Sequence, residues 1–382
     1  MVSMASPRPL VIVALSGGVD SAVATLLLLE QGYRVQALFM SNWDEDEQGY
    51  CTAAEDFQDA RRVSDVLGIP LHKVSFAAEY RRRVFDEFLR EYRAGRTPNP
   101  DVLCNREIKF GVCLDYARRL GGEVLATGHY ARIVHEGDRH RLLKGRDPAK
   151  DQTYFLHAID PAVLPHVLFP VGDLTKDVVR RMARAAALPV FDKRDSTGIC
   201  FIGERPFKEF LAQYLSAQPG NTETPTGEVI GQHQGLMYYT LGQRQGLGVG
   251  GVAGSGEAAW YVARKDLARN ALIVVQGDDH PLLYSGGLRT GPVHWLAAGP
   301  RSGRLNCQIK TRYRQRDQAC TVEFAGNASR VTFESPQRSV TPGQFAVFYD
   351  GEECLGGAVI ESTADDAIVT GPRRALPVSL PI

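Results

Sequence analysis

The sequence lacks an excess of charge of either sign and has few cysteines. Lys and Arg together number 44, as do Asp and Glu, so no strongly basic binder of nucleic acid is visible in the totals and any basic surface must be local. The seven cysteines are an odd number and are scattered from Cys51 to Cys354. That pattern excludes a disulfide scaffold and suits a reducing compartment, for which we expect the cytoplasm.

Long apolar runs and metal-binding spacings are also missing. The longest apolar run near the N-terminus, Leu10 to Leu15, is far shorter than the roughly 20 residues of a membrane span, and no secretory cleavage site follows it. No cysteine pair has the C-x₂₋₄-C spacing of a zinc site. The remaining composition, 44% hydrophobic and 23% charged residues in 382, is that of an ordinary globular chain of two or three domains.

The first half of the sequence alternates strand and helix patterns. Strands are predicted at 10–15, 33–40, 71–76 and 123–127, and helices at 20–32, 57–67, 80–92 and 108–120. This order predicts an α/β domain with a doubly wound parallel sheet over residues 1–206.

The second half is rich in glycine and in short strand patterns. A connecting helix at 207–215 and strands at 259–262 and 271–276 predict a small β-rich domain over 207–284. Strands at 306–313, 319–324, 330–333, 344–349 and 354–360 predict a C-terminal antiparallel β-barrel over 285–382. The glycine-rich segment 242–251 fits either a bulged hairpin or a loop that contacts a partner.

The motif SGGVDS, Ser16 to Ser21, lies between the first strand and the first helix. Its glycines allow close approach of a ligand, and its hydroxyls and the N–H groups of the first helical turn can bind phosphate oxygens. Asp20 is suited to hold Mg²⁺ rather than phosphate. The sequence has neither the kinase-type G-x-x-x-x-G-K-[ST] loop nor a dinucleotide G-x-G-x-x-G after this strand. SGGVDS resembles the loop of the PP-loop ATP pyrophosphatases, which also include amidating and argininosuccinate-type ligases.

Two cysteines lie in segments rich in turn residues. Cys104 follows TPNPDVL just before the predicted helix at 108–120, and Cys200 lies within DSTGICFIGE. A thiolate is favoured near a helix N-terminus, and Asp101 could act as a general base or orient a substrate amide. We interpret Cys113, Cys307, Cys320 and Cys354 as small buried apolar residues. Cys51 is left without an interpretation.

Five motifs identify the closest resemblance. They are NPDVLCN, GHYAR, DQTYFL, STGICFIGE and YTLGQRQGLGVGG, and with the loop and the C-terminal strands they run from residue 14 to beyond residue 340. The residues of these motifs and their order along the chain resemble the tRNA-specific 2-thiouridylase family. The resemblance implies an ATP- and Mg²⁺-dependent sulfurtransferase that converts the wobble uridine, position 34 of tRNA, to 2-thiouridine, AMP and pyrophosphate.

The resemblance also implies a role for individual residues. Cys200 would carry sulfur as a persulfide, Cys104 would be the second catalytic cysteine and form a disulfide with it in turnover, and Asp101 would face the target base. The residues implied for ATP binding are Ala14, Leu15, Ser16, Gly17, Gly18, Val19, Asp20, Ser21, Met40 and Gly128. Those implied for tRNA binding are Asn99, Pro100, Asp101, His129, Lys150, Asp151, Gln152, Arg312, Tyr313, Arg314 and Gln344.

The implied partners are the anticodon stem-loops of Lys, Glu and Gln acceptor tRNAs and a sulfur relay protein or cysteine desulfurase. A monomer is expected, with no membrane association. Lys310, Arg312, Arg314 and Arg316 alternate with other residues, and we expect them to line one face of a strand that binds phosphates. The arginines of 81–96 fit a basic helix, which is more often a solvated surface.

The central expectation is that two distant thiols converge beside the phosphate loop. A thiol sealed in packed hydrocarbon, with no channel and no hinge, would contradict it. Two other functions are weighed: an amidating or argininosuccinate-type ligase, which leaves the cysteines and the barrel without a role, and a non-catalytic RNA-binding protein. Two routes of sulfur attack on the uridine carbon are left open: direct attack by the persulfide, and attack by hydrosulfide released from it.

Overall fold

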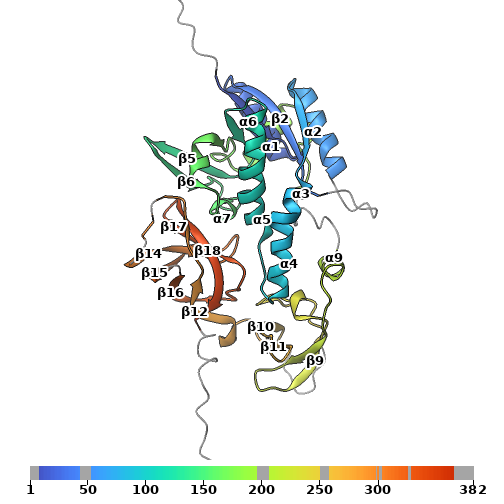
Figure 1. Ribbon diagram of the computed structural model, residues 1–382, viewed down its shortest axis with the longest axis vertical. Coiled ribbons are helices and arrows are strands. Elements are labelled where there is room, and N and C mark those ends of the chain that lie inside the picture. The colour runs from blue at the N-terminus through green and yellow to red at the C-terminus, as the bar shows by residue number, and fades with distance from the viewer. Residues whose placement is uncertain are drawn as a thin grey trace, which may run out of the picture.

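The computed structural model describes residues 8–43, 53–195, 206–249, 258–297, 299–300, 303–325 and 328–364. Figure 1 shows three parts: an α/β domain at the top, a β-barrel at the lower left and a smaller β-rich part at the bottom. The helices α4 and α5 run from the first part toward the other two. Among the described residues, no helix is long and apolar enough to cross a membrane.

The N-terminal sheet is parallel and has the order β3-β2-β1-β4-β7. Its strands are β1 (Leu10–Ala14), β2 (Arg34–Ser41), β3 (Leu71–Ser75), β4 (Val124–Ala126) and β7 (Val167–Leu168). The four predicted strands are confirmed, whereas β7 is too short for a sequence pattern. Successive β1 residues enter different hydrophobic clusters, Ile12 on one side and Val13 on the other. Both faces are therefore covered, which confirms the doubly wound sheet.

Helices of the α/β domain occupy both faces of this sheet. They are α1 (Val19–Glu30), α2 (Ala53–Leu67), α3 (Ala77–Tyr80), η1 (Arg81–Phe85), α4 (Asp86–Arg93), α5 (Pro100–Leu103), η2 (Cys104–Val112), α6 (Cys113–Arg119), α7 (Thr153–Leu156), η3 (Pro161–His166) and α8 (Lys176–Ala185). The helix predicted at 108–120 begins earlier, at Pro100. Asn99 caps it, since its side chain accepts a hydrogen bond from the Asp101 N–H. The prediction that Cys104 precedes the helix is therefore wrong: Cys104 lies one turn inside it.

The C-terminal barrel closes because β12 pairs with both β16 and β18. Around the ring the order is β12-β16-β15-β14-β17-β18. The strands are β12 (Tyr284–Thr290), β14 (Gly303–Lys310), β15 (Gln318–Ala325), β16 (Ala328–Arg338), β17 (Phe345–Asp350) and β18 (Glu353–Thr363), with β13 (His294–Trp295) on β18 and η5 (Pro281–Leu283) before β12. The predicted antiparallel barrel is confirmed.

The basic strand predicted at 306–313 is corrected in its second half. β14 ends at Lys310, and Arg314 has a φ of 64°, in the left-handed region, so the alternation of side chains stops there. Lys310 binds the buried carboxylate of Asp151 at 3.3 Å. Arg312 donates to the carbonyls of Ser339 and Leu241. These cations therefore do not form one strand face.

A hairpin of the first half joins the barrel sheet. Its strands β5 (Ala131–Glu136) and β6 (Arg139–Lys144) are antiparallel, and β6 pairs with β18 through Leu143 and Glu353. Arg139 and Arg141 of the hairpin both bind the Glu353 carboxylate. The sequence patterns did not predict this hairpin.

The small β-rich part lies in sequence between the α/β domain and the barrel. Its strand order is β10-β11-β8-β9. It consists of α9 (Phe207–Ala212), β8 (Gly220–Glu223), β9 (Val229–His233), η4 (Leu236–Tyr238), β10 (Trp260–Asp266) and β11 (Ala271–Gln276). The connecting helix and both predicted strands are present. The Lys265 ammonium donates to the Gly95 carbonyl at 3.1 Å, which joins this part to the end of α4.

Candidate nucleotide and thiol site

The loop Ser16 to Ser21 links the carboxyl end of β1 to α1 and is held by its own serines. The Ser16 N–H donates to the Ser21 hydroxyl at 3.2 Å, and that hydroxyl donates to the Gly18 carbonyl at 3.0 Å. Gly17 has a φ of 78°, and a Cβ there would lie 2.3 Å from the Asp56 carbonyl oxygen. Only glycine fits this position, so the backbone path of the loop depends on it.

The first turn of α1 is built to receive an anion. Its N-cap, Gly18, has no side chain to satisfy the N–H groups that a helix start leaves unpaired. The helix dipole adds partial positive charge at the same place. The unpaired N–H groups of the loop are hydrogen-bond donors, so the residues present fit a phosphate-bearing ligand.

Gly128 packs directly against that loop from the end of β4. A Cβ at Gly128 would lie 2.6 Å from the Ser21 nitrogen and 2.7 Å from the Asp20 carbonyl carbon. Of the predicted nucleotide residues, Ala14 ends β1, Met40 is the second-last residue of β2, and Gly128 lies just after β4. The carboxyl ends of these three strands meet at one edge of the sheet. In open α/β sheets this edge is where ligands bind.

We expect Gly128→Ala to raise the KM for ATP at least about tenfold, because the new methyl group displaces the first turn of α1 from its place. Gly286→Ala is the matched control, since a Cβ at Gly286 meets nothing within 4 Å and its φ is not in the left-handed region. Initial rates of pyrophosphate release over a range of ATP concentrations measure the effect. An unchanged KM in Gly128→Ala would contradict the placement of Gly128 at the nucleotide site.

A charged network lies beside the loop and was not foreseen from the sequence. The Lys176 ammonium, on a side chain only 9% exposed, lies 2.7 Å from a carboxylate oxygen of Asp20 and 2.7 Å from one of Asp195. The Tyr130 hydroxyl donates to Asp20 at 2.7 Å, and burial followed by the Asp20 charge raises the pKa of Tyr130. Lys176 lies 156 residues from Asp20, so no local pattern could indicate this contact.

Asp195 is the last described residue before the segment that contains Cys200. Burial by itself would raise its pKa, but hydrogen bonds from Lys150 and Lys176 outweigh it and lower the pKa to about 2. Lys150, a residue predicted to contact tRNA, lies 2.7 Å from Asp195. Because Asp20 already binds Lys176, a Mg²⁺ ion at Asp20 would have to share or replace this contact.

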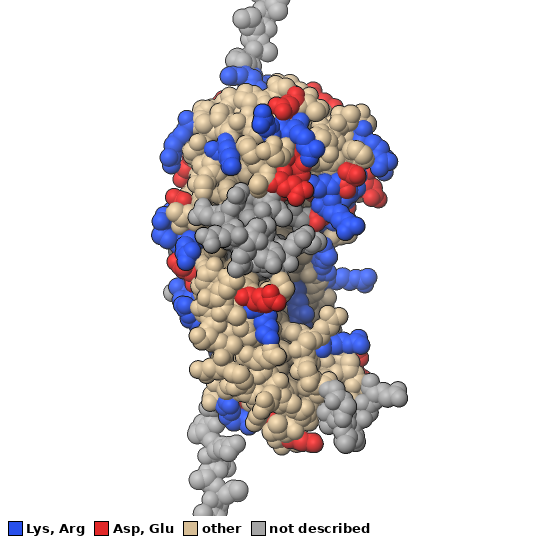
Figure 2. Space-filling model, turned by 90° about the vertical axis from the view of Figure 1, so that its right-hand side faces the viewer, with Lys and Arg blue, Asp and Glu red and all other residues tan. Residues whose placement is uncertain are grey.

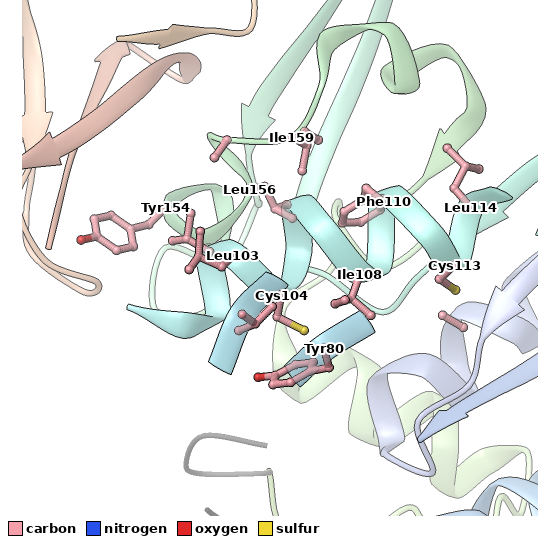
Figure 3. Close-up of a cluster of buried hydrophobic side chains, with 14 of the residues drawn as sticks. Tyr80, Leu103, Cys104, Ile108, Phe110, Cys113, Leu114, Tyr154, Leu156 and Ile159 are labelled. Atoms are coloured by element: carbon pink, nitrogen blue, oxygen red, sulfur yellow. The ribbon is translucent and has the colours of Figure 1, made fainter. Parts of the chain in front are cut away.

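Cys104 is buried within the largest hydrophobic cluster, with 2% of its surface exposed. Figure 3 shows its sulfur directed toward the Tyr80 ring, while Cys113 lies farther along the same helical run. The cluster also contains Ala14 and packs against Met40, two of the predicted nucleotide residues. Cys104 therefore belongs to the same packed unit as the start of the loop, but it is not on the surface.

The other half of the expected thiol pair is outside the described residues. Cys200 lies in 196–205, so the convergence of the two thiols remains a prediction. Cys51 also lies outside the described residues. Cys113 and Cys354 are buried, and burial raises the pKa of Cys113 to about 12, as expected of inert structural thiols.

The NPD motif ahead of Cys104 is fixed by the barrel domain. The Gln344 amide donates to the Thr97 carbonyl at 2.9 Å and to the Pro98 carbonyl at 3.3 Å, and it accepts from the Asn99 amide at 3.5 Å. The Thr97 N–H donates to the Pro342 carbonyl at 3.0 Å. Asn99 and Gln344, both predicted to contact tRNA, are 245 residues apart in sequence and adjacent in the fold.

Asp101 lies in the first turn of this helix and is partly buried. The burial of its carboxyl raises its pKa above the usual value, against the opposing charge of Lys109. A raised pKa suits a carboxyl group that accepts a proton near neutral pH. The general-base role of Asp101 stays a prediction.

Several other predicted tRNA residues are engaged within the protein. The Asp151 carboxylate accepts from Thr153 and from the Gly145 N–H, and Gln152 accepts from the Tyr130 N–H. The His129 ring is 8% exposed, and burial followed by the Lys109 charge lowers its pKa well below the usual value. Tyr313 packs on Phe155 at 4.4 Å between ring centroids. These side chains therefore bind other parts of the protein in this structure, and their contacts with tRNA stay a prediction.

Charge on the molecular surface is mixed. Figure 2 shows Lys and Arg interspersed with Asp and Glu over the α/β domain and sparser over the lower part of this face. On η1 and α4, Arg82 and Arg90 are 66% and 72% exposed and lie near Glu79 and Glu87. On the face shown in Figure 2, basic groups therefore lie among acidic ones.

The parallel sheet and the glycine-rich loop after β1 are those of a nucleotide-binding α/β domain. The family model described as tRNA methyl transferase HUP domain matches residues 9–204. The models described as tRNA methyl transferase PRC-barrel domain and aminomethyltransferase beta-barrel domain match residues 208–276 and 285–360.

Relatives of known name match nearly the whole length of the chain. The tRNA-specific 2-thiouridylase MnmA of Marinobacter nauticus is 58% identical over 374 residues, 97% of this chain and 94% of the relative. That of Chromohalobacter salexigens is 59% identical over 367 residues, 96% of each chain. The chain belongs to the tRNA-specific 2-thiouridylase family. A solved structure, the U34-tRNA thiolase NcsA of Methanococcus maripaludis, is 17% identical, with a TM-score of 0.35 over 56% of this chain and 67% of the other.

Proposed function

We propose that this protein is a tRNA-uridine 2-sulfurtransferase that uses ATP and Mg²⁺ to replace the C2 oxygen of the wobble uridine by sulfur. Membership of the 2-thiouridylase family supports the reaction. The structural observation that supports the proposal is the glycine-dependent loop between β1 and α1, with Gly128 packed against the first turn of α1. The relatives give no support to the ligase alternative.

The chemistry requires activation of a poor leaving group. ATP transfers its adenylyl group to the C2 oxygen and releases pyrophosphate, and that oxygen then leaves as part of AMP. Gly17 and Gly18 would hold the phosphates through their backbone N–H groups, and Ser16 through its hydroxyl. Lys176 would keep the Asp20 carboxylate oriented at the same place.

Sulfur delivery falls to the two cysteines. Cys200 would carry the sulfur as a persulfide, and Cys104 would complete the transfer and be left in a disulfide with Cys200. Direct attack by the persulfide and local release of hydrosulfide by Cys104 give the same products, and an external thiol then reduces the disulfide. Asp101, with its raised pKa, would accept a proton beside the base.

Turnover by this route requires movement near Cys104. With 2% of its surface exposed, the thiol is inaccessible to a nucleobase in this conformation. The cap at Asn99 and the hydrogen bonds from Gln344 fix the start of the helix that carries it. We therefore propose that binding of tRNA shifts this start, through contacts at Asn99, Pro100 and Gln344. Identical positions of 97–104 with and without tRNA would contradict this.

The remaining assignments are also proposals. The tRNA substrates would be the Lys, Glu and Gln acceptors, bound through their anticodon stem-loops, since an anticodon-loop base is partly unstacked and inexpensive to extrude. The sulfur would come from a relay protein or a cysteine desulfurase. We place the enzyme in the cytoplasm as a monomer, with domains at 1–206, 207–284 and 285–382.

Mass spectrometry of tRNA nucleosides tests the function. The full-length protein is incubated with unmodified tRNA, ATP, Mg²⁺ and a persulfide source, and the tRNA is then digested. We expect 2-thiouridine at position 34 together with one pyrophosphate and one AMP per thiolation. ATP-dependent pyrophosphate release without thiolated tRNA, or no release at all, would contradict the proposal.

A further inference from the structure

Two cysteines outside the proposed site face each other across neighbouring strands of the barrel. Cys307 of β14 is paired in register with Cys320 of β15, between the pairs Asn306–Thr321 and Gln308–Ala319. Their Sγ atoms are 3.7 Å apart, which is van der Waals contact for two sulfur atoms. Neither thiol has a part in the proposed thiolation.

We propose that Cys307 and Cys320 are a redox-active dithiol, which a low-molecular-weight disulfide oxidises to an intramolecular disulfide by entering at Cys307. Directly opposed residues of antiparallel strands have Cα atoms about 4.5–5.5 Å apart, within the range of about 4.4–6.8 Å that a disulfide needs. The strands therefore keep their register, and rotation of the two side chains brings the sulfur atoms together.

Access to the pair is one-sided. Cys307 lines a cavity of about 180 Å³, whose other walls include Trp295, Leu305 and Leu355. Cys307 is partly exposed, whereas Cys320 is only 6% exposed and packs among the barrel core residues. A reagent from solution therefore has readier access to Cys307 than to Cys320.

The hydrogen bond with Cys307 and burial raise the pKa of Cys320 above its ordinary value. The order of attack follows from access, because Cys307 is the more exposed of the two thiols.

The exchange balances in two steps. The Cys307 thiolate attacks one sulfur of the small disulfide, forms a mixed disulfide and releases one small thiolate. Cys320 then loses its proton and attacks the Cys307 sulfur, which forms the Cys307–Cys320 bond and releases the second small thiolate. The protein dithiol loses two electrons, and the small disulfide gains them.

Peptide mapping of the intact, folded protein tests this proposal. The protein is treated with hydroxyethyl disulfide, free thiols are blocked, and a non-reducing tryptic digest is analysed by mass spectrometry. We expect a new species in which the peptide Leu305 to Lys310 is joined to Asp317 to Arg330. The peptides of Cys113 and Cys354, which are 0% and 1% exposed, stay unmodified and show that the fold is intact.

Two variants separate the steps. In Cys320→Ser, Cys307 is expected to retain one hydroxyethylthio group, because no second thiol resolves the mixed disulfide. In Cys307→Ser, Cys320 is expected to remain a free thiol. No linked peptide and no adduct on Cys307 in the wild type, or modification of Cys320 in Cys307→Ser while Cys113 stays protected, would overturn the proposal. Thiolation activity does not enter this test, so it stands or falls separately from the proposed function.

Discussion

Cys104→Ala is expected to reduce formation of 2-thiouridine to below about 1% of the wild-type rate while leaving the fold intact. The variant removes the thiol that we propose completes sulfur transfer, and loss of a covalent participant typically costs orders of magnitude. The nucleotide loop is unchanged in this variant. Pyrophosphate release with ATP and unmodified tRNA should therefore continue, and nucleoside mass spectrometry should show little or no thiolated product.

Cys113→Ala is the matched control for Cys104→Ala. Both residues are buried, at 0% and 2% exposed, in the same hydrophobic cluster and the same helical run, so the cost of a small cavity is similar. We expect Cys113→Ala to thiolate tRNA within about threefold of wild type. Cys200→Ala should behave like Cys104→Ala. Equal activity of Cys104→Ala and Cys113→Ala would remove the catalytic role from Cys104.

Lys176→Met is expected to slow ATP-dependent pyrophosphate release about a hundredfold, which also abolishes the thiolation that depends on it. Lys176 is the cation that holds Asp20 of the loop and Asp195 at the same time. Without it Asp20 loses its cation beside a site that must accept a polyphosphate, whereas Asp195 keeps Lys150 and Arg180. Steady-state pyrophosphate release and the KM for ATP measure the effect.

A loss of stability could imitate this result, because Lys176 is a largely enclosed partner in two ion pairs and its removal leaves a carboxylate without that partner. Lys144→Met serves as the matched control. Lys144 is similarly enclosed, 14% exposed, and binds Asp317 at 2.6 Å in the hairpin that joins the barrel. We expect both variants to melt earlier but only Lys176→Met to lose pyrophosphate release. Equal losses of pyrophosphate release in both variants would show that Lys176 has only a structural role.

Much of the site was predictable where residues close in sequence act together. Gly17 and Gly18, followed by the uncapped start of α1, indicated the phosphate loop, and the structure gives that loop the expected place after β1. The start of the helix at Pro100 was missed, although Asn99 and the following proline are a common helix start. Cys104 was consequently expected at a helix N-terminus and lies one turn inside.

The basic side chains of 310–316 show why a local pattern can mislead. Alternation predicted one face of a strand, but the chain turns at Arg314. Lys310 instead neutralises Asp151, and Arg312 binds the backbone around Ser339. These partners come from distant segments, so the spacing of the cations could not reveal them.

The sequence by itself determined the alternating strands and helices of the first domain except β5, β6 and β7, the glycine-dependent loop and the run of antiparallel strands at the C-terminus. Each of these follows from side-chain periodicity and backbone freedom within a few residues. Only the tertiary structure decided that Lys176 binds Asp20, that Gln344 fixes the segment before Cys104, and that the β5–β6 hairpin extends the barrel sheet. These contacts join residues more than 150 positions apart. Their formation depends on how whole elements pack, which no local pattern of residues encodes.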